Sequence, residues 1–152
     1  MSDIKFEGQV ALVTGASRGI GAAIALGLAQ RGLRVTGTAT TDDGAARISQ
    51  ALAAYPGCGG RNLNVNDATA AELLIDSIVK AHGGLQVLVN NAGITRDGMF
   101  RKMSRADWDA VIETNLTSLF NVTKQVIDDM TERGWGRVIN ISSVNGEKGQ
   151  FG

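Results

Sequence analysis

Apolar runs and amphipathic segments alternate along the whole chain. The near-continuous apolar runs predict strands buried on both faces, at 9–14, 34–38, 63–65, 87–90 and 137–141. Segments with helical periodicity lie between them, at 19–31, from 42 or 43 to about 55, at 68–82, and from 104 to about 133. This unbroken β–α alternation predicts an α/β fold, a Rossmann-type doubly wound parallel sheet with helices on both faces.

Polar residues mark where several of these helices begin. Asp42 or Asp43 can cap the second helix, and Asp67 can cap the third. Ser104 opens a capping box with Asp107 ahead of the long fourth helix. That helix carries an apolar stripe, part of which must face the core, made of Trp108, Val111, Ile112, Leu116, Leu119 and Phe120.

Composition and charge exclude several classes of protein. The 152 residues predict one domain, 1–152, and 15 Lys+Arg against 15 Asp+Glu give zero net charge. A neutral chain argues against a nucleic-acid or anionic-membrane partner. One cysteine and one histidine leave no internal disulfide and too few ligands for zinc, so no metal is expected. Neither a signal peptide nor a bilayer-spanning apolar run is visible, and a cytoplasmic location is expected.

A glycine-rich turn follows the first predicted strand and opens the first helix. It reads Thr14-Gly15-Ala16-Ser17-Arg18-Gly19-Ile20-Gly21. Glycine lets the chain turn sharply and lets the backbone approach a pyrophosphate closely. The helix N-terminus then offers free N–H groups to the phosphates. Because the spacing differs from G-x-G-x-x-G, the turn alone is weak evidence, and its place after an apolar strand strengthens it.

The turn and a second motif together resemble one enzyme family. T-G-x-x-x-G-x-G, with Asn90-Asn91-Ala92-Gly93 ending the fourth strand, is similar to short-chain dehydrogenases/reductases over residues 6–152. Residues 8–97 look like bacterial 3-oxoacyl-acyl-carrier-protein reductases, and residues 98–152 like acetoacetyl-CoA reductases. Both classes reduce a 3-oxoacyl thioester with NADPH, so the resemblance implies that reaction on acyl carrier protein or CoA. It also implies a homotetramer with contacts through the stripe of the long helix.

The resemblance implies a dinucleotide at the carboxyl ends of the strands. Its cofactor-binding residues would be Gly15, Ala16, Ser17, Arg18, Gly19, Ile20, Gly21, Thr40, Asn64, Val65, Asn91, Ala92 and Gly93. An NAD site usually has a carboxylate at the end of the second strand, but none occurs here through Thr40. Thr40 can hydrogen-bond a 2′-phosphate and Arg18 supplies positive charge, which favours NADP(H). Asp42 and Asp43 are counter-evidence, because a one-turn shift could bring either to the ribose.

The catalytic set implied by the resemblance is incomplete within these residues. Ser143 would polarise the substrate carbonyl, and Asn115 would interrupt its helix and hold a water in a proton relay. The family's proton donor is a tyrosine followed by a lysine one helical turn on. Both are expected after Gly152, so we expect a fold truncated after strand five and a chain that is inactive alone. A non-catalytic NADP-binding module is the alternative, whereas a receiver domain would need an acidic cluster after the first strand.

Overall fold

Five parallel strands form one sheet in the computed structural model, which describes residues 6–148. Their order across the sheet is β3-β2-β1-β4-β5, and each neighbouring pair is parallel. The strands are β1 (Val10–Val13), β2 (Arg34–Ala39), β3 (Gly59–Asn62), β4 (Val87–Asn90) and β5 (Arg137–Asn140). This order confirms the predicted α/β, doubly wound parallel sheet.

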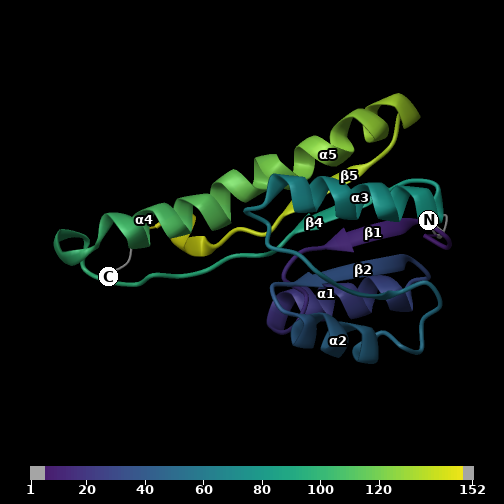
Figure 1. Cartoon of the computed structure of the whole chain (residues 1–152), viewed down its shortest axis with the longest axis horizontal. Helices are drawn as coiled ribbons and strands as arrows, with labels where there is room; N and C mark the ends of the chain where they lie inside the picture. The colour runs from purple at the N-terminus through teal and green to yellow at the C-terminus, as the bar shows by residue number, and fades with distance from the viewer. Residues whose placement is uncertain (1–5, 149–152) are drawn as a thin grey trace.

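Helices cover both faces of the sheet (Figure 1). They are α1 (Gly19–Gln30), α2 (Asp42–Ala51), α3 (Ala68–His82), α4 (Arg105–Ile112) and α5 (Ser118–Arg133). Three short turns are η1 (Phe100–Lys102), the π-turn η2 (Glu113–Thr117) and η3 (Val144–Gly146). α1 and α2 lie on one face, α3 and α5 lie on the other, and α4 continues the line of α5 beyond the sheet. No helix among residues 6–148 has the length and apolar composition needed to cross a membrane.

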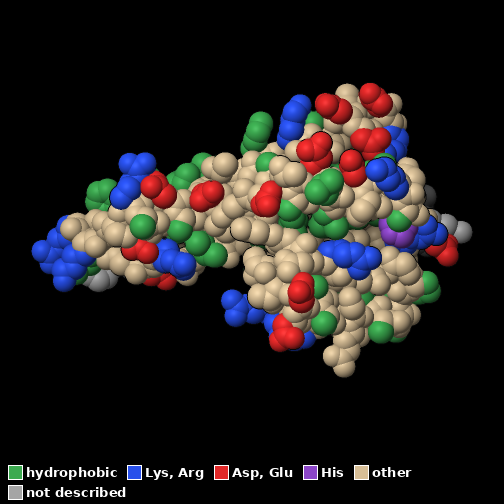
Figure 2. All heavy atoms as spheres, in the orientation of Figure 1, with side chains coloured by type: hydrophobic (Ala, Val, Ile, Leu, Met, Phe, Trp, Pro, Cys, Tyr) green, Lys and Arg blue, Asp and Glu red, His purple; other side chains and the backbone are tan. Residues whose placement is uncertain are grey.

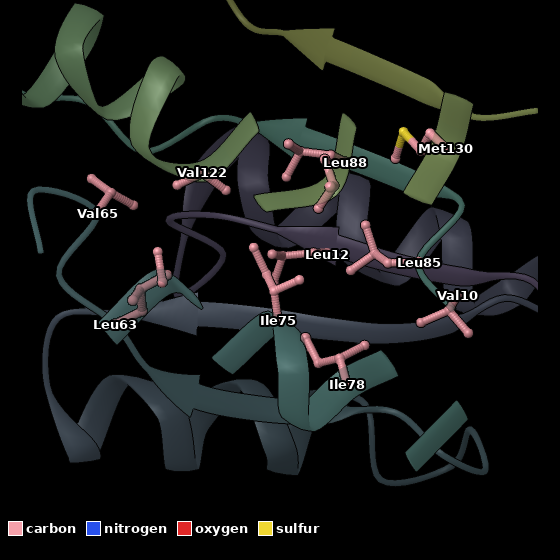
Figure 3. Packing of buried hydrophobic residues seen from close by; sticks show 12 residues of the cluster. Val10, Leu12, Leu63, Val65, Ile75, Ile78, Leu85, Leu88, Val122 and Met130 are labelled. Carbon is pink, nitrogen blue, oxygen red and sulfur yellow. The ribbon is translucent and has the colours of Figure 1, made fainter. Parts of the chain in front are cut away.

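The strands send alternate side chains into two separate cores. In β1, Val10 and Leu12 pack toward α3 and α5, whereas Ala11 and Val13 pack toward α1 and α2. Figure 3 shows the first of these clusters, in which Leu12 lies close to Ile75 of α3. Burial on both faces is the arrangement that the near-continuous apolar runs predicted.

The third strand lies earlier in the chain than its predicted position. β3 is Gly59–Asn62, and Leu63 and Val65 follow it as buried loop residues. A glycine pair is typical of a turn, but a Cβ on Gly60 would lie 2.0 Å from the carbonyl oxygen of Ala45 in α2. Glycine therefore lets α2 pack directly onto a strand. The prediction that placed the strand on the apolar residues was wrong.

The predicted starts of α3 and α4 are confirmed, whereas the predicted end of α2 is not. The long fourth helix, predicted from Ser104 to about Arg133, is divided into α4, η2 and α5 and ends at Arg133. The side chains of Asp67 and Ser104 accept hydrogen bonds from backbone N–H groups three residues on, as N-caps do. α2 ends at Ala51 and does not reach Tyr55. The residue before a proline disfavours helical backbone, which explains why the helix stops short of that position.

The apolar stripe predicted on the long helix lies outside the two cores. α5 instead buries Ser118, Val122, Val126 and Met130, which recur every four residues and face α3 and the sheet. Of the stripe, Val111 and Leu119 are half-buried, and the exposed members are Trp108, Ile112, Leu116 and Phe120. The expectation that part of the stripe must be core was wrong, because a second row of residues fills the core. We call the helical segment 105–133 the arm; the stripe runs along it.

Candidate cofactor site

A hollow of about 570 Å³ lies at the carboxyl ends of the strands, where open α/β sheets bind ligands. It is lined by Gly15, Ser17, Arg18, Gly19, Ile20, Gly21, Ala39, Thr40, Leu63, Asn64, Val65, Asn91, Ala92, Gly93, Ile94 and Thr114. We call it the strand-end hollow. All the predicted cofactor-binding residues line it except Ala16, which is buried and donates its N–H to the carbonyl of Thr38.

Three glycines shape the turn after β1. A Cβ on Gly15, where φ is +65°, would lie 2.9 Å from the Cα of Ala92. A Cβ on Gly21 would lie 2.3 Å from the carbonyl oxygen of Gly15. Gly19 also has a positive φ of +56°, but a Cβ there would meet no protein atom within 4 Å. Close packing therefore requires glycine at Gly15 and Gly21. At Gly19 the missing side chain leaves open space beside the hollow.

The N-terminus of α1 faces the hollow without a side-chain cap. Its N-cap, Arg18, makes no capping hydrogen bond, and the first turn contains no acidic residue. The first N–H groups of a helix have no partner within the helix, and they carry the positive end of its dipole. With the exposed Arg18 side chain beside them, these groups suit an anion such as a pyrophosphate.

Hydrogen bonds between the ends of β1 and β4 hold two motifs together. The Thr14 hydroxyl accepts from the N–H groups of Asn91 and Ala92, both at 3.0 Å. The Asn91 side chain donates in turn to the carbonyl oxygens of Thr14 and Gly15, both at 3.0 Å. The glycine-rich turn and the Asn-Asn-Ala-Gly segment, far apart in sequence, thus form one wall of the hollow.

Thr14 of this wall and Thr38 of β2 are two buried threonines whose substitution should have opposite effects. Thr14 and Thr38 are each 1% exposed, but the Thr38 hydroxyl has no hydrogen-bond partner among the described residues. Thr14→Val should lower the free energy of unfolding by about 2–4 kcal/mol, because two N–H groups lose their acceptor. Thr38→Val should raise it by about 1 kcal/mol, because an unpaired buried hydroxyl is removed. Urea unfolding measures both; a loss of stability in Thr38→Val would show that its hydroxyl is bonded in solution.

The helix after β2 begins at Thr41. Its hydroxyl accepts from the N–H of Gly44 at 3.1 Å and its backbone is extended, so Thr41 is the N-cap. The prediction that Asp42 or Asp43 caps this helix was wrong, since the extended residue lies one position earlier. Both aspartates lie in the first turn, where the helix dipole favours acidic side chains.

The same two aspartates lie outside the lining of the hollow. Asp42 accepts a hydrogen bond from the Asn62 side chain at 2.8 Å, and Asp43 forms an ion pair within its own helix. Thr40 lines the hollow instead. Arg18 is the one charged side chain in the lining within the described part of the chain. An anionic group bound here would therefore meet attraction and no opposing carboxylate.

Asn115 lies in the π-turn η2, where the resemblance implied that the helix is interrupted. Its amide N–H donates to the carbonyl oxygen of Ile94 at 2.9 Å, and its side-chain oxygen accepts from the N–H of Ile94 at 2.8 Å. Both polar ends of Asn115 are thus bonded to the loop after β4. The structure shows a residue that positions this loop, and its part in a proton relay stays a prediction.

Ser143 follows β5 at the same edge of the sheet but does not line the hollow. Its side chain caps η3 and accepts from the N–H of Asn145 at 3.2 Å. The buried amide of Asn90 donates to the Asn140 side chain at 2.9 Å, which aligns the end of β5 with that of β4. Ser143 therefore lies one strand beyond the residues that line the hollow, with its side chain exposed.

Four lining residues were missed by the sequence analysis: Ala39, Leu63, Ile94 and Thr114. Ala39 and Ile94 are direct neighbours of predicted residues in the sequence, so they could have been identified by that adjacency. Leu63 was assigned to a strand, and Thr114 carries no signal of its own because it reaches the hollow through the π-turn.

The lining fits a dinucleotide. Small side chains and uncapped backbone N–H groups suit phosphates, and the hollow extends over the ends of β2 and β4, the two strands that flank β1. Within residues 6–148, three or more His, Cys, Asp or Glu side chains nowhere gather as a metal site needs. The lining offers backbone N–H groups and one cationic side chain to a phosphate-bearing ligand.

Comparison with known proteins agrees with this geometry. A family model described as short chain dehydrogenase matches residues 9–152. The acetoacetyl-CoA reductase of Cupriavidus necator is 53% identical over 148 residues, which cover 95% of this chain and 59% of that protein. The 3-oxoacyl-[acyl-carrier-protein] reductases of Escherichia coli and Vibrio cholerae are each 47% identical over 151 residues, covering 98% of this chain and 60% of theirs. The chain thus spans about 60% of the length of the curated relatives it matches, and it belongs to the short-chain dehydrogenase/reductase family.

Proposed function

We propose that this chain carries the NADPH site of an enzyme that reduces a 3-oxoacyl thioester to the 3-hydroxyacyl thioester. The observation that carries the proposal is the strand-end hollow, in which a glycine cradle and a helix N-terminus lie beside Arg18 and Thr40, and to which residues 6–148 contribute no carboxylate. The names of the relatives support the substrate class, since acetoacetyl-CoA and 3-oxoacyl carrier protein are both 3-oxoacyl thioesters. Acetoacetyl-CoA reduction is the narrower alternative, and a non-catalytic NADP-binding chain is the other.

Each part of the cofactor would be bound by a different group of the described residues. The N-terminus of α1 and the glycine turn would hold the pyrophosphate, and Arg18 and Thr40 would bind the 2′-phosphate. Asn64 and Val65 would flank the adenine, and Asn91–Gly93 would lie beside the other ribose. NADPH supplies the hydride when bound, while the protein binds and orients it.

Ser143 is the residue that we place at the substrate carbonyl. Its hydroxyl accepts one hydrogen bond, from Asn145, and keeps its own proton for donation. A donor at the ketone oxygen stabilises the negative charge that develops there during hydride transfer. Asn115 would act by holding the loop after β4 in place.

The test joins residues 1–152 to the remaining C-terminal part of the Cupriavidus necator relative and follows NADPH oxidation. Turnover of acetoacetyl-CoA is expected; Ser143→Ala should remove most of it, and Ser142→Ala should not. A second arm with an acyl-carrier-protein substrate decides between the two thioester carriers. A chimera that binds NADPH but reduces neither substrate would contradict the reductase and favour the non-catalytic alternative.

Thr40→Asp is expected to shift the preference of the chain from NADPH toward NADH. A carboxylate at the end of β2 would repel a 2′-phosphate and accept a hydrogen bond from a free 2′-hydroxyl. We expect the ratio of the two dissociation constants to change by more than about threefold. Fluorescence titration with both nucleotides measures it. Gln50→Glu, on the exposed end of α2 outside the hollow, changes the net charge equally and should not alter the ratio.

A homotetramer is the assembly that we propose for the enzyme. The exposed stripe of the arm supports this, because Leu116 and Phe120 are large apolar side chains turned away from both cores. Apolar patches of this kind mark interaction surfaces.

A further inference from the structure

Two neighbouring residues of the π-turn hold two different loops of the strand-end hollow. Asn115 bonds to the backbone of Ile94 in the loop after β4. Thr114, one residue earlier, accepts a hydrogen bond from the Asn66 side chain in the loop after β3, at 3.1 Å. One short helical segment therefore connects both sides of the hollow.

The helical geometry of the turn explains this double role. Adjacent residues on a helix point in clearly different directions, about 100° apart in an α-helix and somewhat less in a π-turn, so neighbours can reach loops on different sides. The carbonyl oxygen of Thr114 also accepts from the Ser118 hydroxyl at 2.5 Å, which fixes this part of the turn to α5. π-turns within helices occur frequently at functional sites.

Among residues 6–148, Thr114 is the one hydrogen-bond partner of the Asn66 side chain. The other polar atom of that amide, Oδ1, is buried and has no hydrogen-bond partner among residues 6–148. The backbone N–H of Asn66 donates to the Asn64 side chain at 3.1 Å, so its position also sets that of a lining residue. Asn121 of α5 donates more weakly to the carbonyl of Val65, at 3.3 Å. Leu63 and Val65 anchor the loop in the core, and Thr114 is the side-chain partner that holds Asn66 between them and α3.

We propose that Thr114 is a positioning residue for the adenosine half of the cofactor, an inference that rests on the proposed NADPH site. In a doubly wound sheet the pyrophosphate lies at the first β–α turn and the ribose at the end of the second strand. The adenosine half therefore lies over β2 and β3, and the other half lies over β4. Thr114 holds the loop of the first half, and Asn115 holds the loop of the second.

The test is Thr114→Val, which keeps the shape of the side chain and removes the hydrogen-bond acceptor. The dissociation constant for 2′,5′-ADP should rise about 5- to 10-fold, the scale of one lost hydrogen bond. Hydrogen exchange of 63–67 in the nucleotide-free chain should become faster, and exchange of 92–96 should not. Asn115→Ala should give the reverse exchange pattern. Thr114→Ser should restore wild-type values, and Thr117→Val, at an exposed threonine of the same turn, should change neither measurement.

The two readouts keep this proposal separate from the proposed function. Unchanged exchange of 63–67 and unchanged 2′,5′-ADP affinity in Thr114→Val would overturn the positioning role. Faster exchange with unchanged affinity would show that the bond orders the loop without serving the cofactor, which also overturns it. A wild-type chain that binds neither NADPH nor 2′,5′-ADP would overturn the proposed NADPH site itself, whatever the exchange of the loop.

Discussion

Gly19→Val is expected to abolish NADPH binding by this chain without unfolding it. Gly19 opens α1 and lines the strand-end hollow, and a Cβ there meets no protein atom within 4 Å. The valine side chain would instead occupy the space through which a pyrophosphate approaches the helix N-terminus. We expect the dissociation constant to rise by at least about 100-fold. Fluorescence titration measures the affinity, and urea unfolding reports whether the variant is folded.

A matched control separates steric exclusion from backbone strain. Gly134, after α5, has a φ of +73° and no atom within 4 Å of an added Cβ, as at Gly19, but it does not line the hollow. Gly134→Val should cost about 1–2 kcal/mol of stability, since an L-residue is strained there, and should leave NADPH affinity unchanged. Gly15→Val should lose stability as well as binding, because its Cβ would collide with Ala92. Equal NADPH affinities of Gly19→Val and the wild type would remove the glycine turn from the cofactor site.

Those parts of the fold that rest on local signals could be predicted from the sequence. The run at β4 and the N-cap at Asp67 are decided by residues next to each other in the chain. The position of β3 could not be predicted in this way. Gly60 belongs to a strand because it pairs with Gly37 of β2, and glycine fits there because the carbonyl of Ala45 lies against it. Both contacts exist only once the chain has folded. The apolar Leu63 and Val65 that suggested a strand are instead loop residues, buried on the other face of the sheet with Ile75 of α3 and Val122 of α5.

The residues of the candidate site likewise include some that local sequence signals predict and some that depend on distant contacts. The glycine turn and Asn91 were predictable, because both are short motifs at strand ends. Thr114 was not predictable, because its partner Asn66 lies 48 residues away and a threonine in a helix carries no signal for such a bond. The orientation of the arm was missed for a similar reason. Two apolar rows run along α5, and only contact with α3 decides which row is buried.

The 152-residue chain by itself is expected to show no reductase activity, because residues 6–148 place no suitable proton donor at the hollow. General acid catalysis needs a donor within hydrogen-bond reach of the reacting oxygen. Tyr55, Cys58 and His82 are the only residues of their kinds, and they precede β3 and β4, at the edge of the sheet opposite the hollow. The charged side chain in the described lining is Arg18, which we assign to the 2′-phosphate of the cofactor. NADPH oxidation with acetoacetyl-CoA measures this, and the chimera serves as the positive control.

The same chain is expected to self-associate. β5 is an edge strand of the described sheet, and its Ile139 is 45% exposed. An edge strand presents unpaired N–H and C=O groups that invite pairing with another chain. The arm adds a second adhesive surface, since Leu116 is 60% and Phe120 70% exposed, and Figure 2 shows hydrophobic side chains along it.

Size-exclusion chromatography with light scattering should therefore show oligomers or aggregates of the 152-residue chain. Ile139→Lys should reduce association if the edge of β5 is responsible, because a charged side chain opposes edge pairing. Phe120→Asp should reduce it if the arm is responsible, because it interrupts the apolar stripe. The two variants thus assign the association to a surface. A clean monomer that also reduces acetoacetyl-CoA would refute both the expected association and the expected inactivity, and the proton donor would then have to be sought among the residues that line the hollow.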